Sequence, residues 1–309
     1  MYYFIEFRYN YYKFYLKGSI IISTNQTLSE QFKAFCIRNN PRTKEEAIEY
    51  FAIFGGLDIK VNTTVDINIL IEKLILNKYK YLRNDISYLI KGDNQYYSIL
   101  SALALGDRRT NSAFRRVNIE FDDGIEIVDD LCGLKVLKLE KSLKEFSHLN
   151  NKYIVSEKLI FKSPFVRFWF AFISPIFKGI RDGEYEEFYK IFNNRKSEFI
   201  AFIFEELSHE LLKISFDNDR ITKIGRYWDD DREIGILAKT KSGKVIAGVS
   251  KYTNSKIKKS ELTKLKNICE DAKINVDIFV IFAKKGYSTE LKSLKGRDLK
   301  LFTARNFNF

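Results

Sequence analysis

Cysteine, histidine and proline are scarce in this sequence. The chain has three cysteines, two histidines and three prolines in 309 residues. The cysteines, Cys36, Cys132 and Cys269, are far apart, odd in number and never arranged as CxxC, which excludes a disulfide framework and a zinc ribbon. The low proline and glycine counts exclude a linker-rich chain. The 45% share of hydrophobic residues excludes a disordered one.

Long apolar runs are also missing. No stretch approaches about 18 consecutive apolar residues, so we expect no membrane span and no membrane partner. The opening string MYYFIEFRYNYY has the pattern of neither a secretory signal nor a transit peptide. We therefore expect a cytoplasmic protein. The length alone suggests roughly two domains of about 100–200 residues each.

The positive charge of the chain is concentrated in its last quarter. The formal net charge is +12, yet the residues from Lys239 onwards hold seventeen Lys or Arg and six Asp or Glu, a net charge of +11. An AT-rich genome would add lysines along the whole chain and does not explain this excess. A concentrated basic patch favours a phosphate-rich partner, because counterions are released when lysine and arginine replace them. A solvated lysine-rich face is the competing interpretation.

Periodicity predicts that the first half of the chain is mostly helical. Residues 1–23 read as one or two strands. Thr43 and Glu46 form a capping box that opens a helix, which stops at Gly55-Gly56. Another helix is expected over 66–77. Residues 94–162 then have the pattern of a winged helix, with helices over 94–106, 110–118 and 123–132 and strands over 134–140 and 152–161.

The third helix of this winged-helix pattern is acidic, although in such motifs it usually enters the major groove. It has no lysine or arginine, and its region carries the acids Asp122, Asp123, Glu126, Asp129 and Asp130. Phosphate would repel such a helix, so we expect it to have a structural or protein-contacting role.

The remaining residues, 163–309, predict an α/β domain. An aromatic helix, FVRFWFAFI, follows Ser163-Pro164, and we interpret it as core rather than as a base-stacking platform. Further helices are expected over 186–192, 197–213, 260–272 and 289–294, and strands over 233–239, 244–251, 276–283 and 298–304.

Several strings in this domain occur in a recognisable order: SPFVRFWFAFISP, FEELSHELL, IGRYWDDDREIGI, VSKYTN and FAKKGY. In this combination the domain resembles the C-terminal domain of the archaeal-type ATPase family, which is similar to the PD-(D/E)XK nuclease superfamily. Upstream, EEAIEYFAIFGG resembles the helical lid of that family's ATPase module, and YYSILSALALGD resembles its winged helix.

The resemblance covers about residue 45 to the end and implies an α+β to α/β fold with a mixed sheet. It implies a lid-like remnant over 1–90, a winged helix over 91–162 and a nuclease-like domain over 163–309. The sequence lacks GxxxxGK[ST], so no P-loop cradles a triphosphate and the chain is not a motor on its own. A separately encoded P-loop ATPase is one partner that the resemblance implies.

The nuclease site of the family uses an Asp and a Glu on neighbouring strands to hold Mg²⁺, with a nearby Lys. Carried over position by position, the resemblance places a helix Glu at Glu205, the metal-binding Asp at Gly235, the metal-binding Glu at Val249 and the Lys at Lys251. Glycine and valine offer no side-chain oxygen, so both core ligands are lost. We therefore expect no cofactor; Mg²⁺ or Mn²⁺ would bind only if nuclease activity survived.

A displaced catalytic site is the open alternative. Side chains alternate along a strand, so Glu233 shares a face with Gly235, and Glu205, Glu233 and Lys251 would converge on one cleft. The competing interpretation is that these three are ordinary surface charges. His209, one helical turn after Glu205, is interpreted in the same way as a helix-surface histidine.

Three functions remain after these exclusions. The first is a nucleic-acid-binding protein, with DNA favoured, built on a degenerate and inactive nuclease domain. The alternatives are a Mg²⁺- or Mn²⁺-dependent DNA endonuclease with a relocated site, and an interaction module that docks onto a separate ATPase. The lysines expected to bind nucleic acid are Lys244, Lys251, Lys256, Lys258, Lys259 and Lys264.

Overall fold

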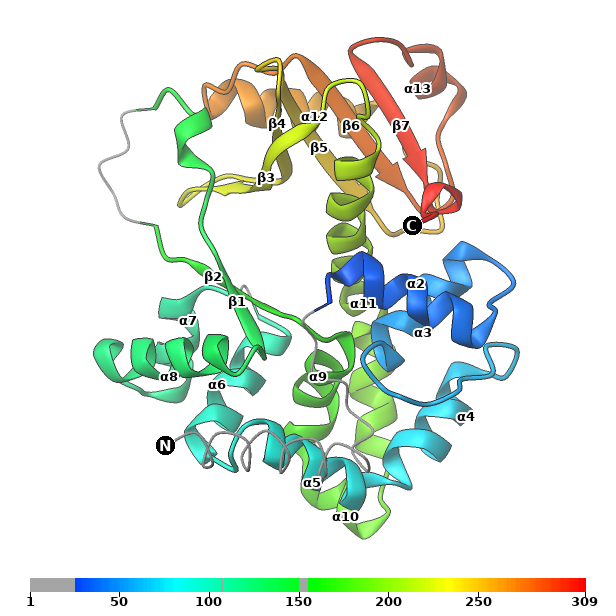
Figure 1. Ribbon diagram of the computed structural model, residues 1–309, viewed down its shortest axis with the longest axis vertical. Helices are drawn as coiled ribbons and strands as arrows, with labels where there is room; N and C mark the ends of the chain where they lie inside the picture. The colour runs from blue at the N-terminus through cyan, green and yellow to red at the C-terminus, as the bar shows by residue number, and fades with distance from the viewer. Residues whose placement is uncertain (1–25, 107, 150–154) are drawn as a thin grey trace, which may run out of the picture.

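The computed structural model describes residues 26–106, 108–149 and 155–309 (Figure 1). The strands expected over 1–23 lie outside these residues. A helical N-terminal region is followed by a mixed five-stranded sheet with helices on both of its faces, which confirms the expected α+β to α/β class.

Short helices form the N-terminal region. They are α2 (Leu28–Asn39), α3 (Lys44–Phe54), α4 (Ile67–Ile71), the π-helix η1 (Glu72–Leu76) and α5 (Tyr79–Leu89). Helix α3 begins after Thr43 as predicted, because the Thr43 hydroxyl accepts a hydrogen bond from the Glu46 amide at 3.1 Å. Only this half of the expected capping box is formed, since Glu46 Oε1 is buried without a hydrogen-bond partner in the described part of the chain. The helix expected over 66–77 is present as α4 and η1. Neither α2 nor α5 is predicted by the sequence patterns above.

The winged-helix pattern is present as three helices and a two-stranded antiparallel sheet. The elements are α6 (Asn94–Ala104), α7 (Thr110–Val117), α8 (Phe121–Gly133), β1 (Leu137–Glu140) and β2 (Lys158–Phe161). Strand β1 is shorter than the expected 134–140. Of the strand expected over 152–161, residues 152–154 lie outside the described residues and 155–157 are not part of β2. The chain leaves the small sheet after Glu140 and follows β3, where the Leu143 amide donates to the Arg226 carbonyl at 2.9 Å.

The aromatic helix and the long helix after it join the helical region to the sheet. They comprise α9 (Pro164–Phe168), the π-helix η3 (Trp169–Ile173), the 3-10 helix η4 (Ser174–Ile176), α10 (Phe177–Asp182) and α11 (Glu186–Ile214). The two helices expected over 186–192 and 197–213 are thus one helix. The polar segment between them holds no glycine or proline, and Arg195 and Lys196 are held by Glu198 and Glu49.

The C-terminal sheet has the strand order β3-β4-β5-β6-β7. The first three strands pair antiparallel, and β5, β6 and β7 pair parallel. The elements are β3 (Ile221–Trp228), β4 (Glu233–Thr240), β5 (Val245–Lys251), α12 (Lys259–Asp271), β6 (Ile278–Ala283), α13 (Thr289–Ser293), β7 (Leu299–Thr303) and the 3-10 helix η5 (Ala304–Asn306).

Helices α11 and α12 cover opposite faces of this sheet (Figure 1). On one face, Ile236 and Val280 pack in the same apolar cluster as residues of α11. On the other face, Leu237 and Ala247 pack with Leu265 of α12. The face that a strand residue occupies therefore decides which helix its side chain meets.

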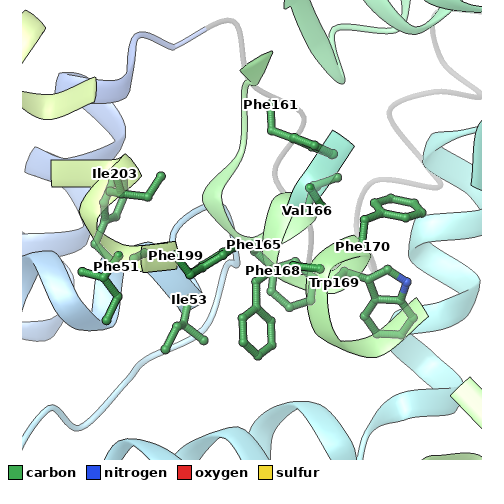
Figure 2. Close-up of a cluster of buried hydrophobic side chains, with 14 of the residues drawn as sticks. Phe51, Ile53, Phe161, Phe165, Val166, Phe168, Trp169, Phe170, Phe199 and Ile203 are labelled. Atoms are coloured by element: carbon green, nitrogen blue, oxygen red, sulfur yellow. The ribbon is translucent and has the colours of Figure 1, made fainter. Parts of the chain in front are cut away.

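The aromatic helix is core, as predicted (Figure 2). Phe168 is fully buried, and its ring lies within 5.4–6.3 Å of the rings of Phe172, Phe188, Phe192 and Phe199. Edge-to-face geometry dominates these pairs, as the quadrupoles of aromatic rings favour. This cluster fastens α9 and η3 to α11.

Within the described part of the chain, no helix is both long enough and apolar enough to cross a bilayer. Helix α11 has the length, but charged side chains recur along it.

We predict that Phe168→Ala lowers the free energy of unfolding by about 3–5 kcal/mol, because a large cavity would open among four rings. Denaturant titration followed by circular dichroism measures this loss. The control is Ile37→Ala, since Ile37 is 75% exposed on α2 and its truncation should change stability by less than about 0.5 kcal/mol. Equal effects of the two substitutions would contradict the prediction.

Candidate nucleic-acid interface

Glu205 lies beside the position where the family resemblance places the metal-binding Asp. It comes from α11 and faces Gly235 of β4. A Cβ atom added to Gly235 would lie 2.8 Å from Glu205 Oε2, which is too close for any side chain to fit unless the carboxylate moves. The Ser250 hydroxyl on β5 is also near, at 3.4 Å from the same oxygen.

An arginine neutralises Glu205. Arg226 of β3 is 1% exposed, and its guanidinium bonds to three carboxylates. It donates to Glu205 Oε1 at 2.8 Å, to Glu206 Oε1 at 2.6 Å and to both oxygens of Glu140 at 2.9 and 3.0 Å. We call these four residues the Arg226 cluster. Lys138 of β1 adds a second cation, 3.1 Å from Glu206.

Charge pairing keeps the Arg226 cluster ionised. Burial alone would raise the pKa of Glu206, but the nearby Lys138 ammonium and Arg226 guanidinium hold this pKa well below its ordinary value. Burial alone would likewise lower the pKa of Arg226, and the surrounding carboxylates instead raise it well above the usual value. Five of the six carboxylate oxygens thus have a cationic partner, and the sixth, Glu205 Oε2, is 3.4 Å from the Ser250 hydroxyl.

Glu233 makes a separate ion pair across to the winged-helix hairpin. Its Oε2 lies 2.7 Å from Nζ of Lys158 on β2, and Lys158 is only 2% exposed. The same ammonium lies 4.7 Å from the centre of the Trp228 ring, a cation–π contact. Burial lowers the pKa of Lys158, and Glu233 opposes that shift.

Lys251 is on the other face of the sheet from Glu205. Its Nζ lies 2.9 Å from Glu261 Oε2 on α12, and Val249, two residues earlier on β5, packs with the α12 clusters. The expected convergence of Glu205, Glu233 and Lys251 on one cleft is therefore not present. Alternation shows which residues of one strand share a face, but not which helix that face meets. Here Gly235 of β4 faces α11, whereas Lys251 of β5 faces α12.

His209 is buried, not a surface residue as expected. It is 8% exposed, and its Nε2 lies 2.7 Å from the Gly235 carbonyl oxygen, to which the neutral ring donates. The pairing of β3 with β4 shifts register between Gly225 and Tyr227, which frees that carbonyl from the ladder. Burial, assisted by the charge of Arg226, lowers the pKa of His209 to about 4.

The six lysines expected to bind nucleic acid do not form one group. Lys244 lies in the turn before β5, at the opposite end of that strand from Lys251. Lys251 and Lys264 share Glu261, and Lys259 pairs with Glu290 at 3.2 Å. No described carboxylate pairs with Lys256 or Lys258, and both are exposed in the loop between β5 and α12.

A second loop brings further lysines to this place. The loop after β6 holds Lys284 and Lys285, and it runs beside the β5–α12 loop because the Ile257 amide donates to the Gly286 carbonyl at 2.9 Å. We call the residues Lys256, Lys258, Lys259, Lys284 and Lys285 the basic rim. Lys284 and Lys285 are not singled out by the sequence patterns, although the pairing rule for parallel strands could have found them, because the carboxyl ends of β5 and β6 lie at the same edge of the sheet.

No group of three or more histidine, cysteine, aspartate or glutamate side chains within the described ranges could hold a metal ion. The Arg226 cluster and the Lys158–Glu233 pair instead connect β1 and β2 of the winged-helix hairpin to α11, β3 and β4. The buried ion pairs of this region thus hold its elements together, whereas the lysines of the basic rim gather at the carboxyl ends of β5 and β6.

Fold and charge together define an α+β to α/β protein whose mixed sheet carries a lysine-rich edge. Residues 169–265 match the family DUF234, archaeal and bacterial proteins of unknown function. An uncharacterized protein of Methanocaldococcus jannaschii is 23% identical over 182 residues, which cover 54% of this chain and 38% of that relative. The chain thus matches well under half of the relative's length. No solved structure matches the chain.

We predict that Arg226→Met lowers the free energy of unfolding by about 3–5 kcal/mol, because the buried Glu206 and the part-buried Glu140 and Glu205 would lose their guanidinium partner. Adding Glu205→Gln and Glu206→Gln to this variant should recover part of the loss. Denaturant titrations measure both effects. Arg181→Met is the control, since its pair with Asp182 is about half exposed and its loss should change stability far less than the loss of Arg226.

A second prediction concerns pH. The unfolded chain binds a proton at His209 below its ordinary pKa of 6.5, whereas the folded chain resists this down to about pH 4. Acidification therefore favours the unfolded state, and His209 should cost about 2 kcal/mol of stability between pH 7.5 and pH 5. Denaturant titrations across this range measure the slope, and His209→Gln should flatten it. An unchanged slope in that variant would contradict the assignment.

Proposed function

We propose that this protein binds nucleic acid, with DNA favoured, through the basic rim. The observation that carries the proposal is that two loops far apart in sequence bring five lysines to one edge of the sheet, at the carboxyl ends of β5 and β6. This edge belongs to the part of the chain with a net charge of +11. Lysines gathered in this way bind phosphates by releasing counterions.

The third helix of the winged-helix pattern, α8, does not offer a competing surface for phosphate. All five acidic residues of α8 are exposed, so its surface would repel a polyanion. The hairpin that usually serves as the wing is held by the sheet, because the Ser142 hydroxyl donates to the Trp228 carbonyl at 2.7 Å and accepts from the Trp228 amide at 2.8 Å. Ser147 continues this attachment at the end of α12, where its hydroxyl donates to the Ala272 carbonyl.

A degenerate nuclease domain fits the same proposal. The last domain resembles the PD-(D/E)XK nucleases of the archaeal-type ATPase family, with Gly235 and Val249 in place of the metal ligands. Loss of carboxylates favours simple binding, because Asp and Glu near phosphates cost free energy when no metal is bound. The relocated endonuclease is disfavoured, since Lys251 and Glu205 lie on opposite faces of the sheet and Arg226 occupies Glu205.

Docking onto another protein is a second candidate function for the acidic helix. Phe121 at the start of α8 is 55% exposed next to Asp122 and Asp123, so the helix presents an aromatic side chain among carboxylates. A basic surface on a separately encoded P-loop ATPase would complement it. This contact would use a different face of the molecule from the basic rim, and both functions could be present together.

We predict that the triple variant Lys256→Ala/Lys258→Ala/Lys259→Ala binds duplex DNA at least tenfold more weakly than the parent at 50 mM salt. The slope of log affinity against log salt should also become about 2–3 units shallower, because each lost phosphate contact removes about 0.9 units. Fluorescence anisotropy with a labelled duplex, measured from 50 to 200 mM salt, gives both quantities.

The matched control is Lys73→Ala/Lys80→Ala/Lys190→Ala, which removes three exposed lysines from the helical part of the chain. It should leave the affinity and the salt slope close to those of the parent. The proposal fails if the two triple variants behave alike. A parallel incubation of plasmid with Mn²⁺ tests for cleavage, which we expect to be absent from the parent.

A further inference from the structure

A cavity of about 500 Å³ lies between α5, α6 and the segment from η3 to α10. It is separate from the basic rim and plays no part in the proposed function. Small-molecule sites in proteins commonly have volumes of about 300–1,000 Å³, so this cavity is large enough for a small organic ligand. Its floor is formed by Tyr79 and Trp169, and Arg83 stands at its exposed side.

The cavity is lined by hydrogen-bonding groups and a single charge. Among the described residues that line it, Arg83 is the only charged side chain, and no described carboxylate forms an ion pair with it. Its guanidinium lies 5.8 Å from the centre of the Phe177 ring, which forms part of the same wall. The hydroxyls come from Ser87, Ser98, Ser101 and Ser174. A lining with one cation and no anion favours a negatively charged ligand.

The phenols of the cavity are available as donors at neutral pH. Burial raises the pKa of Tyr79 and of Tyr97. Both hydroxyls therefore keep their protons and can donate hydrogen bonds. They add two donors to the guanidinium, whose planar fork is suited to carboxylate and phosphate oxygens.

The Trp169 indole supplies a polar atom that nothing in the described part of the chain satisfies. The residue is 1% exposed, and its Nε1 is buried without a hydrogen-bond partner. Figure 2 shows this nitrogen on the edge of the indole that faces away from Phe168. Buried polar groups are nearly always hydrogen-bonded, so an orphaned N–H beside a cavity indicates a missing acceptor.

The rings give the cavity flat walls. Tyr79 stacks on Trp169 with 5.7 Å between ring centres and 6° between planes, and Tyr97 and Phe177 add further aromatic surface. We propose that this cavity binds a small organic anion: a planar ring that carries a phosphate or a carboxylate. The ring packs on the aromatic walls, and the anionic oxygens accept from Arg83 and the nearby hydroxyls.

Calorimetric titration of the full chain tests the proposal with two matched pairs of probes. Adenosine monophosphate is compared with adenosine, and salicylate with salicylamide, so that each pair differs in its anionic group. At least one anion should bind, and it should bind at least tenfold more tightly than its uncharged partner. If only one of the two anions binds, the result identifies phosphate or carboxylate as the preferred anionic group. The proposal is overturned if neither anion binds or if charge makes no difference.

Two variants locate the binding. Arg83→Gln should weaken the bound anion about tenfold or more and leave its uncharged partner unchanged. Ser98→Trp keeps the charge but fills the exposed side of the cavity, so it should weaken both members of the pair. Arg115→Gln is the control, since Arg115 is also exposed on a helix but lies outside the cavity. Equal binding by the parent and Arg83→Gln would overturn the proposal, and circular dichroism confirms that each variant is folded.

Discussion

The burial of Arg226 is the constraint on which the centre of the molecule depends. A guanidinium at 1% exposure must have its donors filled, and here three carboxylates from two elements fill them. Glu140 comes from the winged-helix hairpin, whereas Glu205 and Glu206 come from α11. The cluster therefore fixes β1, β3 and α11 relative to one another. Buried ion pairs of this kind add little net stability over apolar packing. A conformation that separates the guanidinium from its carboxylates is nevertheless strongly destabilised, because buried charges are left unpaired.

The same cluster changes the meaning of Gly235. By the family resemblance this glycine is a lost metal ligand. In the structure, Glu205 Oε2 lies 2.8 Å from the place that a Cβ atom of residue 235 would take, so the glycine also makes room for the carboxylate that Arg226 binds. The cation that binds these carboxylates is thus a guanidinium of the chain itself. Binding of a divalent cation would have to compete with the bonds of 2.8 and 2.6 Å that Arg226 makes to Glu205 and Glu206.

The sequence predicted local features well and pairings poorly. Thr43, the aromatic helix and the strands β4 to β7 follow from capping, periodicity and apolar runs, and the structure confirms them. The sequence patterns predicted two helices where α11 is one continuous helix. The polar residues between them have no apolar periodicity, and the ion pair of Lys196 with the distant Glu49 cannot be seen from the local sequence. His209 and Lys251 were misplaced for a related reason: their surroundings are set by a register shift and by Glu261, neither of which periodicity reveals.

Surface charge differs between the side of the molecule that carries α8 and the side that carries the basic rim. The internal ion pairs compensate one another in part, since Arg226 and Lys138 face three carboxylates and Lys158 faces Glu233. At the surface, α8 is acidic and lies on the left of Figure 1, whereas β7 ends near the C-terminus on the right, beside the strands that carry the basic rim. A polyanion would be repelled from the first side and attracted to the second. The exposed charges thus differ between the two sides of the molecule, while the fold beneath them is held by the ion pairs that the chain has buried.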